Sequence, residues 1–318
     1  MLSALTMAAV LATAQPATAT AIELIAPGPE AALHGTLLKP AGKTRATMVI
    51  IPGSGPTDRD GNNPLGVAGG PYRKLAEALA ERHVATVRID KRGMFASKAA
   101  IPDANQVRIA DYAVDAAAWI TAARKATGAR CVWLAGHSEG GLVALAASTT
   151  PHVCGLVLIS TLGRPMGEVI RDQLKANPAN APILAPALAA IDQLEAGKHV
   201  VVAALHPALQ QLFAPQVQDF LIDSFRIDPA KLLSAYRGRV LIVQGDRDLQ
   251  VGMADASRLA AADPRATLAV IAGANHVLRA VPADDRAANF ASYAKTDAPL
   301  APGIADAIAS FVLQGSGK

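Results

Sequence analysis

The sequence predicts an α/β fold in which a mostly parallel sheet is flanked by helices and carries a helical cap insertion. Short apolar runs, typical of strands buried on both faces, alternate with longer segments of helical period. One strand run, at 131–135, leads through a glycine-rich turn directly into a buried helix. The alternation stops between 161 and 237, where prolines separate several helical segments and no buried strand is evident. Alternating strands and helices imply parallel pairing with helices on both faces.

Each element follows from its own pattern. The expected strands are 32–39 (alternating, of the edge type), 47–51, 84–89, 131–135, 155–160, 240–243 and 267–271. The expected helices outside the insertion are 72–82, 109–126, 142–147, 254–262 and 304–313. These elements divide the chain into a core of 22–160 and 238–318 and a cap of 161–237. Because ligands of such sheets bind at the carboxyl ends of the strands, the cap is expected to cover a site there.

Composition excludes several classes of protein. The 318 residues are 51% hydrophobic and 18% charged, which suits a large buried core and argues against disorder. The formal net charge is +4, and the Lys and Arg are scattered without interleaved aromatics, so a nucleic-acid partner is not expected. No apolar run is long enough to span a bilayer. The oligomeric state does not follow from these features.

Residues 1–21 have the features of a secretory signal peptide. They contain no charged side chain, and an apolar stretch is followed by Ala-x-Ala steps. The basic start of a signal peptide is missing, so an Ala-rich tail is the alternative. With the signal peptide, the protein is expected to be exported, either periplasmic or secreted.

Two cysteines begin neighbouring predicted strands. Cys131 and Cys154 are therefore near enough to form a disulfide, which export permits, and two buried thiols are the alternative. No set of Cys and His has zinc-ligand spacing, so no metal site is expected.

The turn after 131–135 fits a nucleophile elbow. Gly136-His137-Ser138-Glu139-Gly140 matches G-x-S-x-G between a strand and a helix. The serine of such a turn has a strained backbone, so residues two before and two after it must be small. The helix behind Ser138 directs its free N–H groups at the reaction centre. Ser138 is the candidate nucleophile, and His137 is expected to point away from the pocket.

A serine nucleophile needs a base and a group that orients the base. His276 follows the last predicted strand and can reach across the sheet to Ser138. The acid is expected in the loop after 240–243, where Asp246 and Asp248 compete. Asp248 is preferred because Val251 can anchor its turn, whereas Asp246 is expected to bind loop N–H groups.

An oxyanion requires two N–H donors. The backbone N–H of Glu139 follows the nucleophile, and the second donor is expected in the glycine-rich loop after 47–51. Ser54 is the preferred donor and Gly55 its rival. The Glu139 carboxylate is expected to lie on the surface or to anchor a loop, since a negative charge beside an oxyanion would be harmful.

Together these segments resemble the α/β-hydrolase superfamily, specifically its esterase/lipase and serine-aminopeptidase-like branch. The resemblance rests on Pro52–Gly61, Asp90–Gly93, Gly136–Gly141, Gly245–Val251 and Asn275–Leu278. It implies a Ser–Asp–His triad in that chain order, no cofactor, and hydrolysis of esters, thioesters or amides of small acyl substrates through an acyl-enzyme. Two departures are visible: Pro52 stands where the family usually has a His, and the loop from Met94 to Ser97 lacks a second Gly.

The leading functional prediction is a carboxylesterase, because the cap is rich in Leu, Ala and Val. A peptidase or thioesterase on the same triad is the alternative, and a non-catalytic binding protein is a further one. Arg59 and Arg92 could bind a substrate carboxylate, although such loop charges more often pair with each other. An acid in the cap that holds a substrate ammonium would favour a peptidase, and Glu168 and Glu195 are the Glu residues there.

Overall fold

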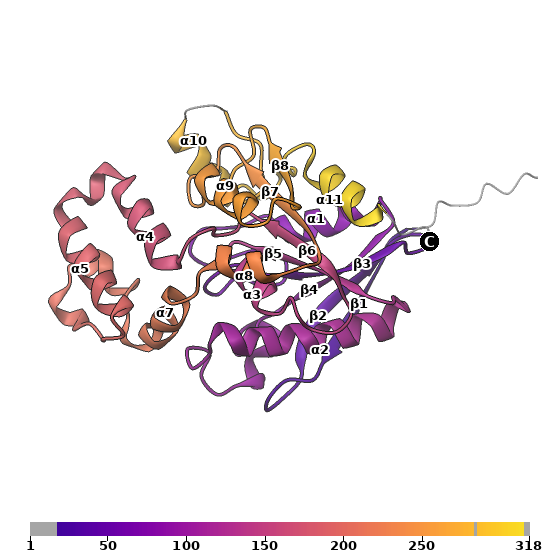
Figure 1. Ribbon diagram of the computed structural model, residues 1–318, viewed down its shortest axis with the longest axis horizontal. Helices are drawn as coiled ribbons and strands as arrows, with labels where there is room; N and C mark the ends of the chain where they lie inside the picture. Colours follow the sequence, from indigo (N-terminus) through magenta and orange to yellow (C-terminus); the bar gives the residue numbers. More distant parts are fainter. Residues whose placement is uncertain (1–17, 283–284, 315–318) are drawn as a thin grey trace, which may run out of the picture.

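The computed structural model describes residues 18–282 and 285–314 and is built on one eight-stranded sheet (Figure 1). The strand order is β1-β2-β4-β3-β5-β6-β7-β8. Strand β2 is antiparallel to both its neighbours, and all pairs from β4 to β8 are parallel. The strands are β1 Thr20–Ala26, β2 Leu33–Lys39, β3 Ala46–Ile51, β4 Val84–Ile89, β5 Val132–His137, β6 Val153–Ile159, β7 Arg239–Gly245 and β8 Thr267–Ile271.

Helices cover both faces of the sheet, so side chains that alternate along a strand enter two separate cores. In β3, Val49 and Ile51 pack into one core, and Met48 and Ile50 pack into the other. The first core is covered by α2 Ile109–Thr127, α3 Glu139–Ala146, α8 Pro229–Ala235 and α9 Met253–Ala262. The second is covered by α1 Pro71–Ala80 and α11 Ile304–Leu313. This double burial explains why the central strands are continuous apolar runs.

The cap lies to one side of the sheet and has a core of its own (Figure 1). Its elements are α4 Met166–Lys175, η2 Pro178–Ile183, α5 Leu184–Glu195, η3 Val202–Ala204, α6 Pro207–Gln210, η4 Pro215–Val217 and α7 Gln218–Phe225. Proline is the first residue of η2, α6 and η4, where its missing N–H costs no helical hydrogen bond. Helix α8, which ends the predicted cap range 161–237, packs instead on α3 and α9 beside the sheet.

The N-terminal strand and three short helices were not predicted. Strand β1 pairs along its whole length with β2, so the prediction that 32–39 is an edge strand is wrong. The predicted signal peptide lies outside the described residues except for 18–21, of which Thr20 and Ala21 begin β1. The unpredicted helices are η1 Phe95–Ala100, α10 Arg286–Ala291 and η5 Ser292–Ala294. They are too short to show a helical period.

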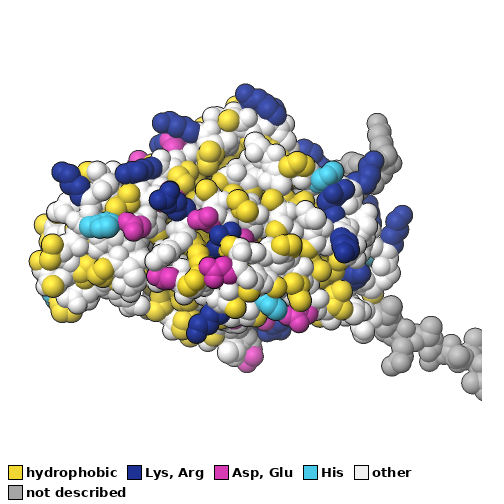
Figure 2. Space-filling model, turned by 90° about the horizontal axis from the view of Figure 1, so that it is seen from below, with side chains coloured by type: hydrophobic (Ala, Val, Ile, Leu, Met, Phe, Trp, Pro, Cys, Tyr) yellow, Lys and Arg dark blue, Asp and Glu magenta, His cyan; other side chains and the backbone are white. Residues whose placement is uncertain are grey.

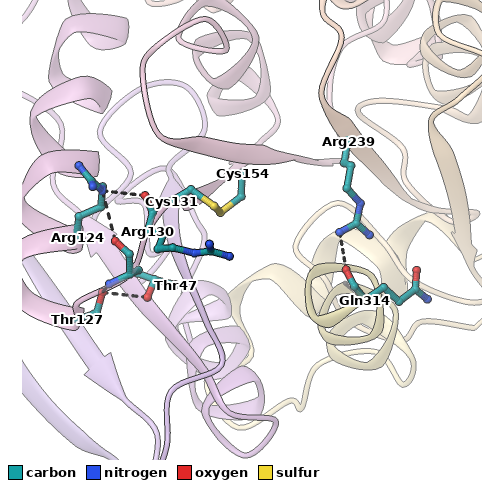
Figure 3. Close-up of a disulfide and its surroundings, with 9 residues drawn as sticks. Thr47, Arg124, Thr127, Arg130, Cys131, Cys154, Arg239 and Gln314 are labelled. Carbon is teal, nitrogen blue, oxygen red and sulfur yellow. Dashed lines mark hydrogen bonds between the residues drawn. A yellow bond between two sulfur atoms is a disulfide. The ribbon is translucent and has the colours of Figure 1, made fainter. Parts of the chain in front are cut away.

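The two cysteines form a disulfide that joins the start of β5 to the start of β6 (Figure 3). The Cα atoms of Cys131 and Cys154 are 5.2 Å apart, and 23 positions separate them in the chain. A crosslink that closes a loop of this length stabilises the fold by about 3 kcal/mol in the chain-entropy account. Beside it, Arg239 donates to the backbone oxygen of Gln314 and ties α11 to the sheet.

Charged side chains on the face seen in Figure 2 lie in separate places among apolar ones. In the part of the chain that the structure describes, no helix is both long and apolar enough to cross a membrane. The same residues contain no group of three or more His, Cys, Asp or Glu placed to hold a metal ion.

Candidate active site

Ser138 occupies a sharp turn between β5 and α3. Its backbone angles, φ 55° and ψ −123°, are sterically unfavourable for a residue with a Cβ. The glycines on either side make the turn feasible. A Cβ on Gly136 would lie 2.1 Å from the Gly140 oxygen, and one on Gly140 would lie 2.3 Å from the Ile51 oxygen. The G-x-S-x-G pattern is therefore required by backbone packing, and it leaves Ser138 at the N-terminus of α3.

Asp248 and His276 form a hydrogen-bonded pair above the carboxyl ends of β7 and β8. The Asp248 Oδ2 atom lies 2.8 Å from His276 Nδ1, and both side chains are buried. The other oxygen, Oδ1, accepts hydrogen bonds from the Gln250 and Val251 N–H groups at 2.8 and 2.9 Å. Burial favours a higher pKa for Asp248, but the charge and hydrogen bond of His276 and the two N–H groups outweigh it and lower that pKa. Asp248 is thus held ionised beside the imidazole.

The competing acid has a different partner. Asp246 accepts a hydrogen bond from the Gly273 N–H at 2.7 Å and is partly exposed. It therefore joins the loop after β7 to the loop after β8. The structure brings Asp248, and not Asp246, to His276.

Ser138 and His276 line one cavity of about 100 Å³ together with residues of the loop after β3. Within the described residues, neither the Ser138 hydroxyl nor His276 Nε2 makes a hydrogen bond. His276 Nε2, the nitrogen that faces away from Asp248, therefore has no hydrogen-bond partner among these residues. A base that takes a proton from a nearby hydroxyl needs such a nitrogen.

The predicted oxyanion donors are also unengaged. In the ranges 18–282 and 285–314, the backbone N–H groups of Ser54, Gly55 and Glu139 donate to no protein group. The Gly53 N–H donates to the Tyr72 hydroxyl at 3.2 Å, so this neighbour is not free to bind an oxyanion. The choice of Ser54 over Gly55 stays a prediction.

The Glu139 side chain is not on the surface, in contrast to one of the two expectations. It is 2% exposed, and its Oε1 lies 3.6 Å from the Lys91 ammonium, which donates to the Gly53 oxygen at 2.7 Å. Burial raises the pKa of Glu139 and lowers that of Lys91, and each partner opposes the shift in the other. The pair joins the elbow helix to the oxyanion loop, so the carboxylate does anchor a loop.

The loop arginines Arg59 and Arg92 pair with acids of the protein, which is the alternative to binding a substrate carboxylate. Arg59 binds Asp90 through two nitrogens, at 2.6 and 3.0 Å. Arg92 binds both oxygens of Asp115 at 2.7 Å. These guanidinium groups fix the loops around the site and are not directed at a substrate carboxylate.

A buried relay behind the pair was not predicted. Tyr72 Oη lies 2.8 Å from His137 Nδ1, and His137 Nε2 lies 2.8 Å from the backbone oxygen of His276. A carbonyl oxygen only accepts, so His137 donates from Nε2, and its Nδ1 accepts from the Tyr72 hydroxyl. The His137 ring also contacts the His276 ring, with centroids 4.7 Å apart, so the prediction that it points away from the pocket is wrong. No sequence signal joins Tyr72 to this histidine, 65 positions away.

The buried His137 predicts acid sensitivity. Burial, and then the charge of nearby His276, lower the pKa of His137 to about 3. An unfolded histidine titrates near ~6.5, so below that pH the unfolded chain binds a proton at His137 that the folded chain does not bind. His137 costs no stability above ~6.5, and between pH 7 and pH 4 it is expected to lower the free energy of unfolding by about 3 kcal/mol.

Urea unfolding of the wild type and His137→Gln at pH 7, 5.5 and 4 checks this expectation. The variant keeps an amide donor for the His276 oxygen but cannot titrate, so its stability should fall less steeply. His83→Asn replaces an exposed loop histidine and should follow the wild type. Parallel curves for His137→Gln and the wild type would contradict the assignment.

Comparison with known proteins agrees with this architecture. Residues 48–292 match the family described as "Alpha/beta hydrolase family", which is more than half of the chain. The chain belongs to the α/β-hydrolase family. The fold and the family resemblance predicted from the sequence are thus confirmed.

Solved esterase structures share the fold of this α/β hydrolase. The esterase domain of a Rhodothermus marinus protein is similar with a TM-score of 0.56 and 15% identity, covering 94% of this chain and 100% of that one. The Pyrococcus furiosus esterase PF2001 gives 0.54 and 16%, covering 84% and 88%. Est1E from Butyrivibrio proteoclasticus gives 0.53 and 17%, covering 80% and 90%. No curated protein matches the sequence.

Proposed function

We propose that this α/β hydrolase cleaves carboxylic esters through an acyl-enzyme, with Ser138 as nucleophile, His276 as base and acid, and Asp248 as the group that orients His276. The observation that carries the proposal is the 2.8 Å Asp248–His276 hydrogen bond, placed at a cavity that His276 shares with the strained elbow serine. The family assignment and the esterases of similar fold support hydrolase activity in general.

The reaction follows from these roles. The Ser138 oxygen attacks the carbonyl carbon while its proton moves to His276 Nε2, and the carbonyl electron pair moves onto the oxygen. The tetrahedral intermediate collapses, the ester C–O bond breaks, and the leaving oxygen takes the proton from His276. Water then attacks the acyl-enzyme in the same manner, which releases the acid and returns the proton to Ser138. Asp248 stabilises the imidazolium in both halves.

Two backbone donors would hold the oxyanion. The Glu139 N–H lies at the positive end of α3, and the Ser54 N–H lies in the loop that Lys91 fixes through Gly53. Because the Glu139 carboxylate is paired with Lys91, its charge is partly compensated beside the oxyanion.

An ester is favoured over a peptide with a free amino terminus. Neither Glu residue of the cap lines a cavity beside Ser138. Glu195 is paired with Arg171, and Glu168 is exposed. No Asp or Glu of the cap lines either cavity at Ser138, so the cap places no carboxylate there for a substrate ammonium, whereas its apolar side chains suit an ester. A thioesterase remains the alternative on the same groups.

A panel with one substrate of each class, an oxygen ester, a thioester and an anilide, tests the proposal. With p-nitrophenyl butyrate, butyryl thiocholine and alanine p-nitroanilide, we expect the oxygen ester to have the highest kcat/KM, by at least about 100-fold over the anilide. A preference for the thioester or the anilide would replace the carboxylesterase with the corresponding alternative. No turnover of any of the three would favour a binding protein.

We also propose that the protein is exported. The Cys131–Cys154 disulfide supports this, because disulfides persist in oxidising compartments. The leader-like composition of 1–21 supports it independently. Detection of the mature protein outside the cytoplasm, with its N-terminus beyond the leader, is the direct test.

A further inference from the structure

Ser138 lies where two cavities of different size meet. The smaller has a volume of about 100 Å³, and the larger, beneath the cap, has a volume of about 730 Å³. Ser54, Ser138 and Gln250 line both. An ester bound with its carbonyl carbon at Ser138 has two substituents, so one substituent enters each cavity.

Polar and apolar side chains line both cavities, so the cavities differ mainly in size. The apolar wall of the larger one comes from α4 and α7 of the cap, among them Met166, Val169, Ile170, Phe220 and Leu221. The smaller one is lined by the loop after β3, with polar groups from Thr57 and Asn63 and apolar groups from Val67 and Leu278. Its volume equals that of about three waters, whereas the larger lies in the range of ligand pockets, roughly 300–1,000 Å³.

The position of His276 decides which substituent enters which cavity. The proton that His276 takes from Ser138 must pass to the oxygen of the leaving alcohol, so that oxygen must lie within hydrogen-bond reach of Nε2. Of the two cavities, His276 lines only the smaller. Glu139, the N–H donor of the proposed oxyanion site, lines only the larger. The alcohol side therefore points into the smaller cavity and the acyl side into the larger.

We propose that the preferred substrates are esters of a bulky apolar acid with a small alcohol. The acyl chain lies beneath the cap, and an alcohol of a few heavy atoms lies between His276 and the loop after β3. This inference rests on the proposed ester hydrolysis and adds the orientation of the ester, that is, which of its two sides enters which cavity. Each acyl methylene that the cap covers should raise kcat/KM by about fourfold until the cavity is full.

Two isomeric esters test the direction with hydrophobicity nearly constant. Methyl octanoate and heptyl acetate contain the same atoms and the same kind of ester bond, but the long chain is on the acyl side in one and on the alcohol side in the other. Hydrolysis is followed by acid release at constant pH, below the solubility limit of both. We expect methyl octanoate to have at least a tenfold higher kcat/KM.

The possible results distinguish a failure of this inference from a failure of the proposed ester hydrolysis. A ratio below about threefold, or a preference for heptyl acetate, overturns the proposed direction and leaves ester hydrolysis intact. If neither isomer is cleaved and a fluorophosphonate does not label Ser138, the proposed function itself fails.

Two variants probe the cavities separately. Ile170→Trp fills part of the larger cavity, so the ratio of methyl octanoate to methyl acetate turnover should fall at least tenfold. Val67→Ala widens the smaller cavity, and the ratio of propyl octanoate to methyl octanoate turnover should rise severalfold. Val201→Trp introduces the same side chain at an exposed cap position that lines neither cavity, and should change neither ratio. Thermal unfolding of each variant checks that it is folded, and unchanged ratios in folded Ile170→Trp and Val67→Ala overturn the assignment.

Discussion

Ser138→Ala is expected to lower kcat for ester hydrolysis by about 10,000-fold or more, because no other hydroxyl can replace one positioned by the elbow. The loss should appear in kcat, since the alanine leaves both substrate cavities in place. Alanine has the same Cβ as serine, so the positive φ of 55° costs the variant no more than it costs the wild type, and the variant should fold. The measurement is turnover of p-nitrophenyl butyrate by purified wild type and variant.

Ser148→Ala provides the matched control. Ser148 is buried, lies beyond the far end of α3 and lines neither cavity at Ser138. Its removal should change kcat by less than about threefold, the range of an ordinary side-chain effect on a remote site. Wild-type activity in Ser138→Ala would assign the nucleophile elsewhere.

Asp248→Asn is expected to lower kcat by about 10,000-fold, the loss typical of an orienting acid replaced by its amide. The amide oxygen can still accept the Gln250 and Val251 N–H groups, so its NH₂ would face His276 Nδ1. An NH₂ donor forces Nδ1 to accept and leaves the proton on Nε2. The imidazole would then be unable to take the Ser138 proton.

Asp246→Asn separates this effect from a general effect of charge. Asp246 lies two positions away, and its amide can still accept the Gly273 N–H. Its kcat should stay within about threefold of the wild type. Equal losses in the two variants would point to a shared structural role for the loop after β7 and would contradict the orienting role of Asp248.

Much of this architecture could be predicted because burial on two faces produces an unmistakable pattern. The predicted strand 240–243 lies inside β7, because a strand covered by helices on both sides is a continuous apolar run. The elbow was visible because its backbone tolerates only glycine two residues before and after Ser138. Ser138, Asp248 and His276 each follow a predicted parallel strand, and the carboxyl ends of these strands lie at one edge of the sheet.

The parts that escaped prediction are those without a local pattern. Strand β1 is mostly exposed, so few of its side chains show burial, and its start coincides with the expected leader. The Tyr72–His137 relay and the Lys91–Glu139 pair join side chains from different elements, which only the folded sheet brings together. For the same reason the sequence could not choose between a disulfide and two thiols for Cys131 and Cys154.

The central claim is that His276, oriented by Asp248, activates Ser138 toward an acyl carbon. Mass spectrometry after treatment with a fluorophosphonate tests it most directly, because such a reagent reacts with a serine that a neighbouring base has activated. The account predicts one adduct per chain, located on the peptide that contains Ser138, and strongly slowed labelling in His276→Ala. An unlabelled wild type, an adduct on another residue, or undiminished labelling in His276→Ala would contradict it.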